Sequence, residues 1–429
     1  MPQPCTNANA HESRPSPGFA AAQADPELED IIRQVDELEA QTRALMEQHG
    51  LTRDDIAAYL PAFTDATDDA KRAKSHTEAP PGSQPSGPGA STASTAPAHN
   101  LTREDVIARA AAGVSMAGQT LSGIDLSGAD LSQADFTRAT FEGTRLVGCN
   151  LAGARLHEAR LRRCDLAEGN LQKVDLALAT LEACDLRGAR LREARLQSVH
   201  CVSTRMDGAH LEYTALADAI IEDCSMVGLQ ASACQAVKAR FSACDLRNAD
   251  FTESQLTRVT FDDCRLEDAG FAEAACARAA FSASCAKGAR FPAADLRNTR
   301  ADADTNFDHA NFADAQLAGA NWSRASMCGA SFPGAILDDA DFCDVQARGC
   351  LFRLASAKRC RFDRADLRDA DMSTINLFRG SLRASRLDGA QLRDANLFGV
   401  NFDGSNPDPG NLQGSNIDHA RMARRCTRG

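Results

Sequence analysis

Cysteines are the residues of this sequence best placed for chemistry, because thiols can form disulfides, hold zinc or act as nucleophiles. The chain has 429 residues, of which 16 are cysteines. No two cysteines form a CxxC pair, the spacing typical of zinc sites. Five of them are separated by one or two steps of a twenty-residue interval, at Cys164, Cys184, Cys224, Cys244 and Cys264.

Cysteines at this spacing would lie above one another if the chain folded into stacked coils of the same length. Their Cβ atoms would then be about 4.8 Å apart, which is longer than the ~3.8 Å typical of a disulfide. We therefore expect reduced, buried thiols that act as small apolar side chains. Reduced thiols in turn indicate a cytoplasmic protein.

The other reactive side chains show no catalytic arrangement. The nine histidines are scattered, and none recurs with a serine or cysteine nucleophile. Carboxylates occur throughout, so a close pair of them carries no information, and no glycine-rich phosphate-binding loop is present. We expect no enzymatic activity, no metal site and no cofactor.

Charge and hydropathy exclude two classes of partner. The chain carries 47 Lys+Arg and 59 Asp+Glu, a net charge of −12, and the first 100 residues hold much of this excess. The rest is nearly neutral and has no basic stripe for nucleic acid. No apolar run reaches the 18–20 residues of a membrane-spanning helix, and residues 1–26 lack the pattern of a secretory signal.

A five-residue repeat must position all of these side chains. A large apolar residue, most often Leu or Phe, returns every fifth position from Leu121 to Leu296, and the series resumes one residue late at Phe307 and continues to Met422. A small residue lies two positions before each of these centres, and Asp, Asn or Arg commonly lies between. A period of five fits neither a helix nor an ordinary strand, but it does fit short extended segments joined by turns.

This pattern resembles the pentapeptide repeat family, whose motif A(D/N)LXX stands here as ADLSQ at residues 129–133 and ADLRD at residues 365–369. The resemblance implies an all-β solenoid: a right-handed, four-sided β-helix with one pentapeptide per side and four pentapeptides per coil.

A second period supports this coil length independently of the resemblance. Phenylalanines recur at every tenth position from Phe241 to Phe291, which would place them on two opposite sides of a four-sided tube. The sixty repeat positions make about 15 coils, a rod roughly 70 Å long at ~4.8 Å per coil.

The repeats over residues 119–422 are preceded by segments of a different composition. We expect disorder in residues 1–26 and a flexible linker in residues 74–99, which are rich in Pro, Ser and Gly. Residues 100–118 should form a capping helix with Thr102 as N-cap and Asp105 three positions later. An arginine-rich tail, residues 423–429, follows the last repeat.

Residues 27–73 are expected to be helical, with an apolar stripe at Leu28, Ile31, Val35 and Leu38. This stripe is a candidate surface for binding a partner or for forming a homodimer. The alternative is that it packs on the next segment of the chain.

The one-residue shift in the repeat frame is a second candidate feature. It falls between Leu296 and Phe307 and should make a bulge that presents Asp302 and Asp304. Either these carboxylates bind a partner, or the bulge is a tolerated insertion.

The entry segment carries the functional expectation. Residues 101–113 and the first repeats are similar to those of pentapeptide repeat proteins encoded with bacterial type VI secretion systems. This resemblance implies a non-enzymatic scaffold or adaptor that helps an effector or spike-tip protein to load. The alternative is a regulator or protector of DNA gyrase or topoisomerase that imitates DNA. Residues 101–429 carry 40 basic and 44 acidic side chains, so their net charge is too small to imitate a polyanion well.

Overall fold

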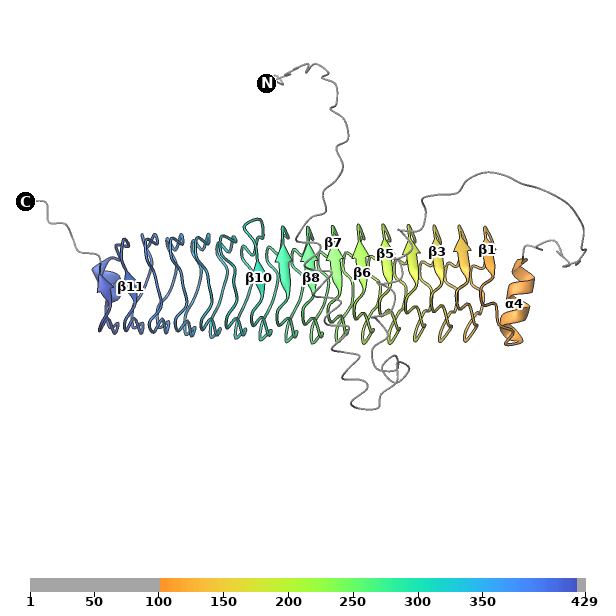
Figure 1. The fold of residues 1–429 in the computed structure, drawn as a ribbon, viewed down its shortest axis with the longest axis horizontal. Coiled ribbons are helices and arrows are strands. Elements are labelled where there is room, and N and C mark those ends of the chain that lie inside the picture. Colours follow the sequence, from red (N-terminus) through yellow and green to blue (C-terminus); the bar gives the residue numbers. More distant parts are fainter. Residues whose placement is uncertain (1–100, 423–429) are drawn as a thin grey trace, which may run out of the picture. The chain divides into compact units, whose positions relative to one another are not determined.

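A computed structural model describes residues 101–422, which form a right-handed, four-sided parallel β-helix of about 15 coils (Figure 1). Each residue lies above its counterpart one coil earlier, as in the pairing of Leu121 with Phe141, so a coil takes four pentapeptides. The fold expected from the five-residue repeat is confirmed. The expectations for residues 1–26, 27–73, 74–99 and 423–429 fall outside the described residues.

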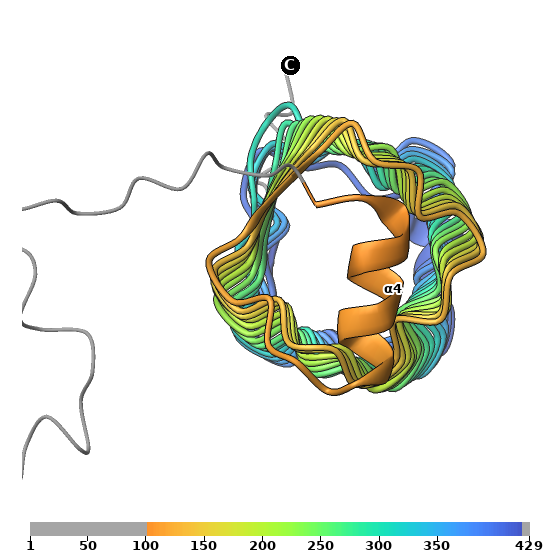
Figure 2. The same ribbon diagram turned by 90° about the vertical axis from the view of Figure 1, so that its right-hand side faces the viewer.

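Helix α4 (Arg103–Ala111) lies across the open N-terminal end of the tube (Figure 2). The hydroxyl of Thr102 accepts a hydrogen bond from the Asp105 N–H at 3.2 Å, and the Asp105 carboxylate accepts one from the Thr102 N–H at 3.1 Å. The helix buries Val106. The Arg103 side chain donates to two backbone carbonyls of the first coil. The helix therefore covers coil edges that would otherwise be exposed.

One side of the tube is a ten-stranded parallel sheet whose strands follow chain order. Its short strands are β1 (Thr120–Ser122), β2 (Thr140–Glu142), β3 (Arg160–Arg162), β4 (Thr180–Glu182), β5 (His200–Val202), β6 (Ile220–Glu222), β7 (Arg240–Ser242), β8 (Thr260–Asp262), β9 (Ala280–Ser282) and β10 (Arg300–Ala301). The other three sides pair through single bridges at the same one-coil interval until the frame shifts. Near the C-terminal end, β11 (Asn401–Phe402) pairs with β12 (Arg421–Met422).

The repeat centres fill the interior of the tube. Leu246 and Leu266 are fully buried, one coil apart. Phe241 stacks on Phe261 with ring centroids 5.3 Å apart, and it meets Phe251 edge to face at 6.2 Å. Alternating sides therefore place rings both parallel and perpendicular to one another, an arrangement worth roughly 1 kcal/mol per pair beyond the area buried.

The structure explains why the motif has Asp or Asn directly before each centre. The Asp130 carboxylate accepts a hydrogen bond at 3.1 Å from the backbone N–H of Ser132, two residues on, and Asn311 does the same for Ala313. Residues at the next position, such as Gln133, have a positive φ near 60°. This strained conformation is held by a turn bond, here from the Ala134 N–H to the Leu131 carbonyl at 3.2 Å.

The corner that follows β1–β9 is built differently from the other three. No backbone turn bond closes this corner in the described coils before the frame shift. Instead, the Ser284 hydroxyl accepts from the Cys264 N–H at 3.1 Å and donates to the Phe261 carbonyl at 3.2 Å. A hydroxyl or thiol from the next coil donates to the corresponding carbonyl nine times in succession: Thr144, Cys164, Cys184, Thr204, Cys224, Cys244, Cys264, Ser284 and Thr305.

The cysteines of this column are therefore hydrogen-bond donors as well as small buried residues. In residues 101–422 the 14 cysteines are free, and 12 of them are buried. The assignment of a purely apolar role was incomplete, because the twenty-residue spacing alone does not reveal that this corner lacks its turn bond.

The frame shift ends this type of corner. After β10, the corresponding corner closes with a backbone bond, from the Ala325 N–H to the Trp322 carbonyl at 3.1 Å. The same position then holds Ala325, Val345 and Ala365, which have no donor in the side chain, before serine returns at Ser385 and Ser405. The extra residue thus marks a change in turn geometry, and its loop stands out from the wall in Figure 2.

The last coil departs from the predicted pattern. Its centres Ile417 and Met422 are exposed by 44% and 39%, because no described coil stacks above them. A 3-10 helix, η1 (Pro409–Leu412), replaces part of this coil where Pro407 and Pro409 interrupt the repeat. Within residues 101–422, none of the helices has the length and hydropathy needed to cross a membrane.

Candidate protein-binding surface

Most ion pairs on the wall join side chains on adjacent coils. Arg138 pairs with Glu158 at 2.8 Å and Arg364 with Asp344 at 2.6 Å, in each case across adjacent coils. Each such exposed pair contributes little stability, about 0–1 kcal/mol. Their effect is to leave much of the surface without free charge.

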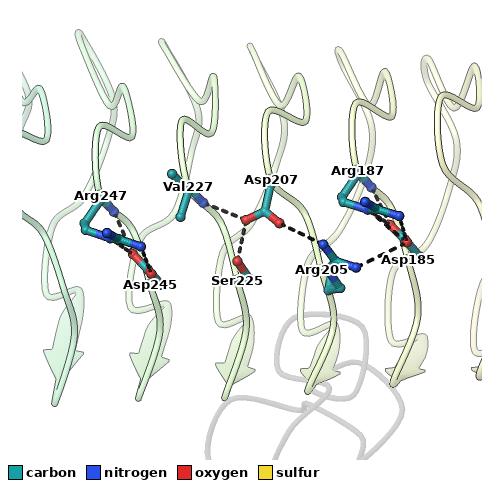
Figure 3. A network of polar contacts seen from close by, with 8 residues as sticks. All are labelled: Asp185, Arg187, Arg205, Asp207, Ser225, Val227, Asp245 and Arg247. Carbon is teal, nitrogen blue, oxygen red and sulfur yellow. Dashed lines mark hydrogen bonds and ion pairs between the residues drawn. The ribbon is translucent and has the colours of Figure 1, made fainter.

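The side that follows the ten-stranded sheet shows how thoroughly carboxylates are used within the wall (Figure 3). Asp185 is bonded by Arg187 at 2.6 Å, and Arg205 lies between Asp185 and Asp207 at 3.9 Å from each. The Arg187 guanidinium lowers the pKa of Asp185, and Arg247 lowers that of Asp245 in the same way.

Asp207 in the same view bonds to the coil above. It accepts a hydrogen bond from the Ser225 hydroxyl, and another from the Val227 N–H at 3.1 Å. Serine at position 225 stands where Asp or Asn usually caps this N–H, so a carboxylate from the coil below does so instead. These groups hold the wall together, and they are poor candidates for a binding site.

The structure separates the two carboxylates predicted at the frame shift. The Asp302 carboxylate accepts hydrogen bonds from the Ala283 N–H at 3.0 Å and the Asp304 N–H at 3.2 Å. The Thr305 hydroxyl lies 2.8 Å from this carboxylate, and its single hydrogen is accepted either there or by the Phe281 carbonyl. Asp302 therefore stabilises the loop, whereas Asp304, which is also exposed, has no side-chain hydrogen bond or ion pair with any of residues 101–422. Their role toward a partner stays a prediction. The predicted residues Leu28, Ile31, Val35 and Leu38 lie outside the described residues.

Burial suppresses the reactivity of thiols in the wall. Burial raises the pKa of Cys149 and of Cys201 to about 12, so both are held as thiols at neutral pH. Among residues 101–422, no three His, Cys, Asp or Glu side chains are grouped so that they could hold a metal ion.

An outward-facing aromatic group near the C-terminal end differs from the rest of the wall. Phe378 and Phe398 each follow a repeat centre and are partly exposed, while every other phenylalanine of residues 101–422 is buried. Their rings stack with centroids 5.4 Å apart, and the His419 ring lies 5.0 Å from that of Phe398, tilted by 57°. The Arg379 guanidinium lies over the Phe378 ring at 5.1 Å. We call these four residues the aromatic ladder.

The sequence analysis did not identify this ladder, although the signal is present. Phe378 and Phe398 are separated by the length of one coil, and each lies one position after a centre, Leu377 or Leu397. That position elsewhere holds mostly small or polar residues. A search for large apolar residues out of frame would have found the pair.

Two family models match the sequence of this chain. The model described as pentapeptide repeats (8 copies) matches residues 115–153, 144–182, 175–212, 305–342, 335–373 and 375–406. The model described as a pentapeptide repeat region matches residues 194–271. Together they cover more than half of the chain. No curated protein matches it in sequence.

Solved structures of similar proteins include two with named roles. QnrB1, a plasmid-mediated fluoroquinolone resistance protein, is 21% identical over 44% of this chain and 90% of its own, with a TM-score of 0.31. HetL, involved in heterocyst differentiation regulation in the cyanobacterium Nostoc, is 24% identical over 70% of this chain and 97% of its own, with a TM-score of 0.17. At these identities and scores, neither likeness carries an argument about function.

Proposed function

We propose that this chain, which belongs to the pentapeptide repeat family, is a non-enzymatic scaffold that binds another protein through the wall of its β-helix. A fold does not define a function, so the proposal rests on one observation, the aromatic ladder. Aromatic and arginine side chains are the types most enriched at the centres of protein interfaces.

The surroundings of the ladder suit protein recognition. Phe378 and Phe398 are stacked on adjacent coils of a hydrogen-bonded wall, so little conformational freedom is lost when a partner covers them. Arg379 supplies a charged group beside the rings. A pocket on the partner that accepts flat rings and a carboxylate that meets Arg379 would complement this surface.

The partner is proposed to be a type VI secretion effector or spike-tip protein. The support for this class is the similarity of residues 101–113 and the first repeats to secretion-associated members of the family. The alternative, a DNA-imitating regulator of gyrase or topoisomerase, would need an acidic wall. The pairing of arginines with carboxylates between coils disfavours it.

The test is capture of secretion components by the tagged full-length protein, compared with the variant F378S/F398S. Serine is common at this position of the repeat, so the variant should fold. We expect the variant to capture at most about one tenth as much effector or spike protein as wild type. Truncating one aromatic hot spot costs about 2 kcal/mol of binding free energy. The matched control is Y213S, which removes an aromatic that is 56% exposed and lies elsewhere on the wall.

Two outcomes would count against the proposal in different ways. Equal capture by wild type and F378S/F398S would remove the ladder as the binding surface. Ladder-dependent capture of a partner unrelated to secretion would retain the scaffold and reject the type VI assignment.

A further inference from the structure

The wall follows a rule that makes exceptions informative. Where charged residues stack one coil apart, they usually alternate in sign, as in the pairs Lys173–Glu193 and Asp339–Arg359. Opposite charges on adjacent strands attract, and like charges directly opposite one another are destabilising. A stack of like charges without partners is therefore a place where another molecule could lower the free energy.

Such a stack runs along the edge at which the chain enters the ten-stranded sheet. Three of its residues occupy the same corner of successive coils: Lys238, Arg258 and Arg278. Two more begin strands beside this corner, Arg240 in β7 and Arg300 in β10. All five side chains are exposed except in their stems, and none has an ion pair or side-chain hydrogen bond with any of residues 101–422. We call these five residues the basic ridge.

The opposite edge of the same sheet carries the opposite charge. Asp262 is the last residue of β8, and Asp263 begins the corner that follows it. Asp223 follows β6, and Asp304 lies in the loop after β10. These four carboxylates are exposed and have no ion pair within the described part of the chain. We call them the acidic ridge. It runs from β6 to β10, alongside the basic ridge at β7 to β10.

The strip between the two ridges is made of small side chains. Outward positions of β7, β8 and β9 hold Ser242, Thr260, Ala280 and Ser282. A flat surface can approach this strip closely, because no long side chain stands in the way. The sheet side at β7–β9 is therefore a strip of small side chains between a positive edge and a negative edge, whereas β6 presents Ile220 and Glu222 outward.

We propose that this strip binds a second copy of the chain, with the two rods parallel and related by a two-fold axis along their length. Rotation by 180° about such an axis brings the strip face to face with its copy and places each edge opposite the other edge of the copy. The basic ridge of each copy then faces the acidic ridge of the other. An antiparallel pair would instead place like charges together.

The heights of the charges at β8 and β10 agree with this arrangement, whereas at β6 the exposed Asp218 and Asp223 lie on opposite edges and would oppose it. A two-fold axis along the rod keeps each residue at its own height, so every strand of one copy faces the same strand of the other. Arg258 and Asp262 lie on opposite edges of β8, and Arg300 and Asp304 lie on opposite edges of β10. Each of these arginines therefore meets the carboxylate of the same strand in the partner, and each contact occurs twice.

The size of the strip sets the strength of the dimer. Five strands at ~4.8 Å span only about 20 Å along the rod, and a stable interface buries about 800 Å² per partner. The strip is smaller than this, so the dimer is weak and depends on charge. Salt at about 0.5 M shortens the screening length from about 10 Å to near 4 Å and should dissociate it.

Charge reversal tests the proposal on the full-length protein by sedimentation velocity over a range of concentrations at low salt. The variant R258E/R278E reverses the charges at the centre of the basic ridge, and D262K/D263K reverses those at the centre of the acidic ridge. Glutamate and lysine already occupy this corner position elsewhere, at Glu253 and Lys238, with positive φ. We expect each variant alone to have a dissociation constant at least about tenfold higher than that of wild type.

The most decisive experiment combines the two charge reversals. An equimolar mixture of the two variants should associate again, and so should the fourfold variant R258E/R278E/D262K/D263K, since both restore opposite charges across the interface. The control E253K/E273K reverses charges at the same heights on a different corner and should behave as wild type.

Three results would overturn the proposal. One is a wild-type chain that stays monomeric at every concentration at low salt. The second is a pair of reversed variants that dimerise like wild type, which would place self-association elsewhere. The third is a mixture of the variants that fails to restore association.

Discussion

Single side chains in this protein make hydrogen bonds that the five-residue pattern does not specify. The corner after each strand of β1–β9 lacks its turn bond, and a hydroxyl or thiol from the next coil takes the place of that bond. The sequence shows Thr, Cys and Ser in this column before the frame shift, and Ala and Val at its first three positions afterwards. It does not show which corner is open, because that depends on backbone geometry.

Replacing Ser284 with Ala should lower the free energy of unfolding by about 1–3 kcal/mol. The change leaves the buried Cys264 N–H and Phe261 carbonyl without their bridging partner. Ser284→Cys should cost less, because a thiol fills this role elsewhere in the column. Urea unfolding measures the difference, with Ser282→Ala on the outer surface as control. Equal stability of Ser284→Ala and the control would show that the bridge is dispensable.

Elements of this fold were predictable to the extent that they repeat. The period of five gives the buried centres, and the period of twenty gives the stacking of Phe241 on Phe261. The position of the bulge between Leu296 and Phe307 was also readable from the frame. What the bulge does was not, because Asp302 and Asp304 look equivalent in sequence and differ only in their hydrogen bonds.

Replacing Asp302 with Ala should therefore lower the stability by about 0.5–1.5 kcal/mol, since two backbone N–H donors lose their acceptor. Asp304→Ala should change it by no more than about 0.5 kcal/mol, as is usual for exposed sites. Thermal unfolding of the two variants side by side measures this contrast. Comparable losses in both would mean that the loop is held in another way.

At the largest scale that the structure describes, residues 119–422 form a rod in which distance along the axis follows from residue number. Each coil contacts its neighbours, so stability is close to a sum over coils and their interfaces. This regularity made the architecture predictable from sequence, whereas the binding surfaces are departures from it. The aromatic ladder breaks the rule of polar outer positions, and the basic and acidic ridges break the rule of paired charges.

The most direct test of this account is a set of distances between pairs of spin labels on one side of the rod, measured by pulsed electron paramagnetic resonance. Labels attached through non-natural residues at Ser122 and Ser242 should be about 29 Å apart, and labels at Ser122 and Ser282 about 38 Å apart, at ~4.8 Å for every coil. Separations that do not grow in proportion to residue number would contradict the stacked coils, and with them the assignment of both binding surfaces.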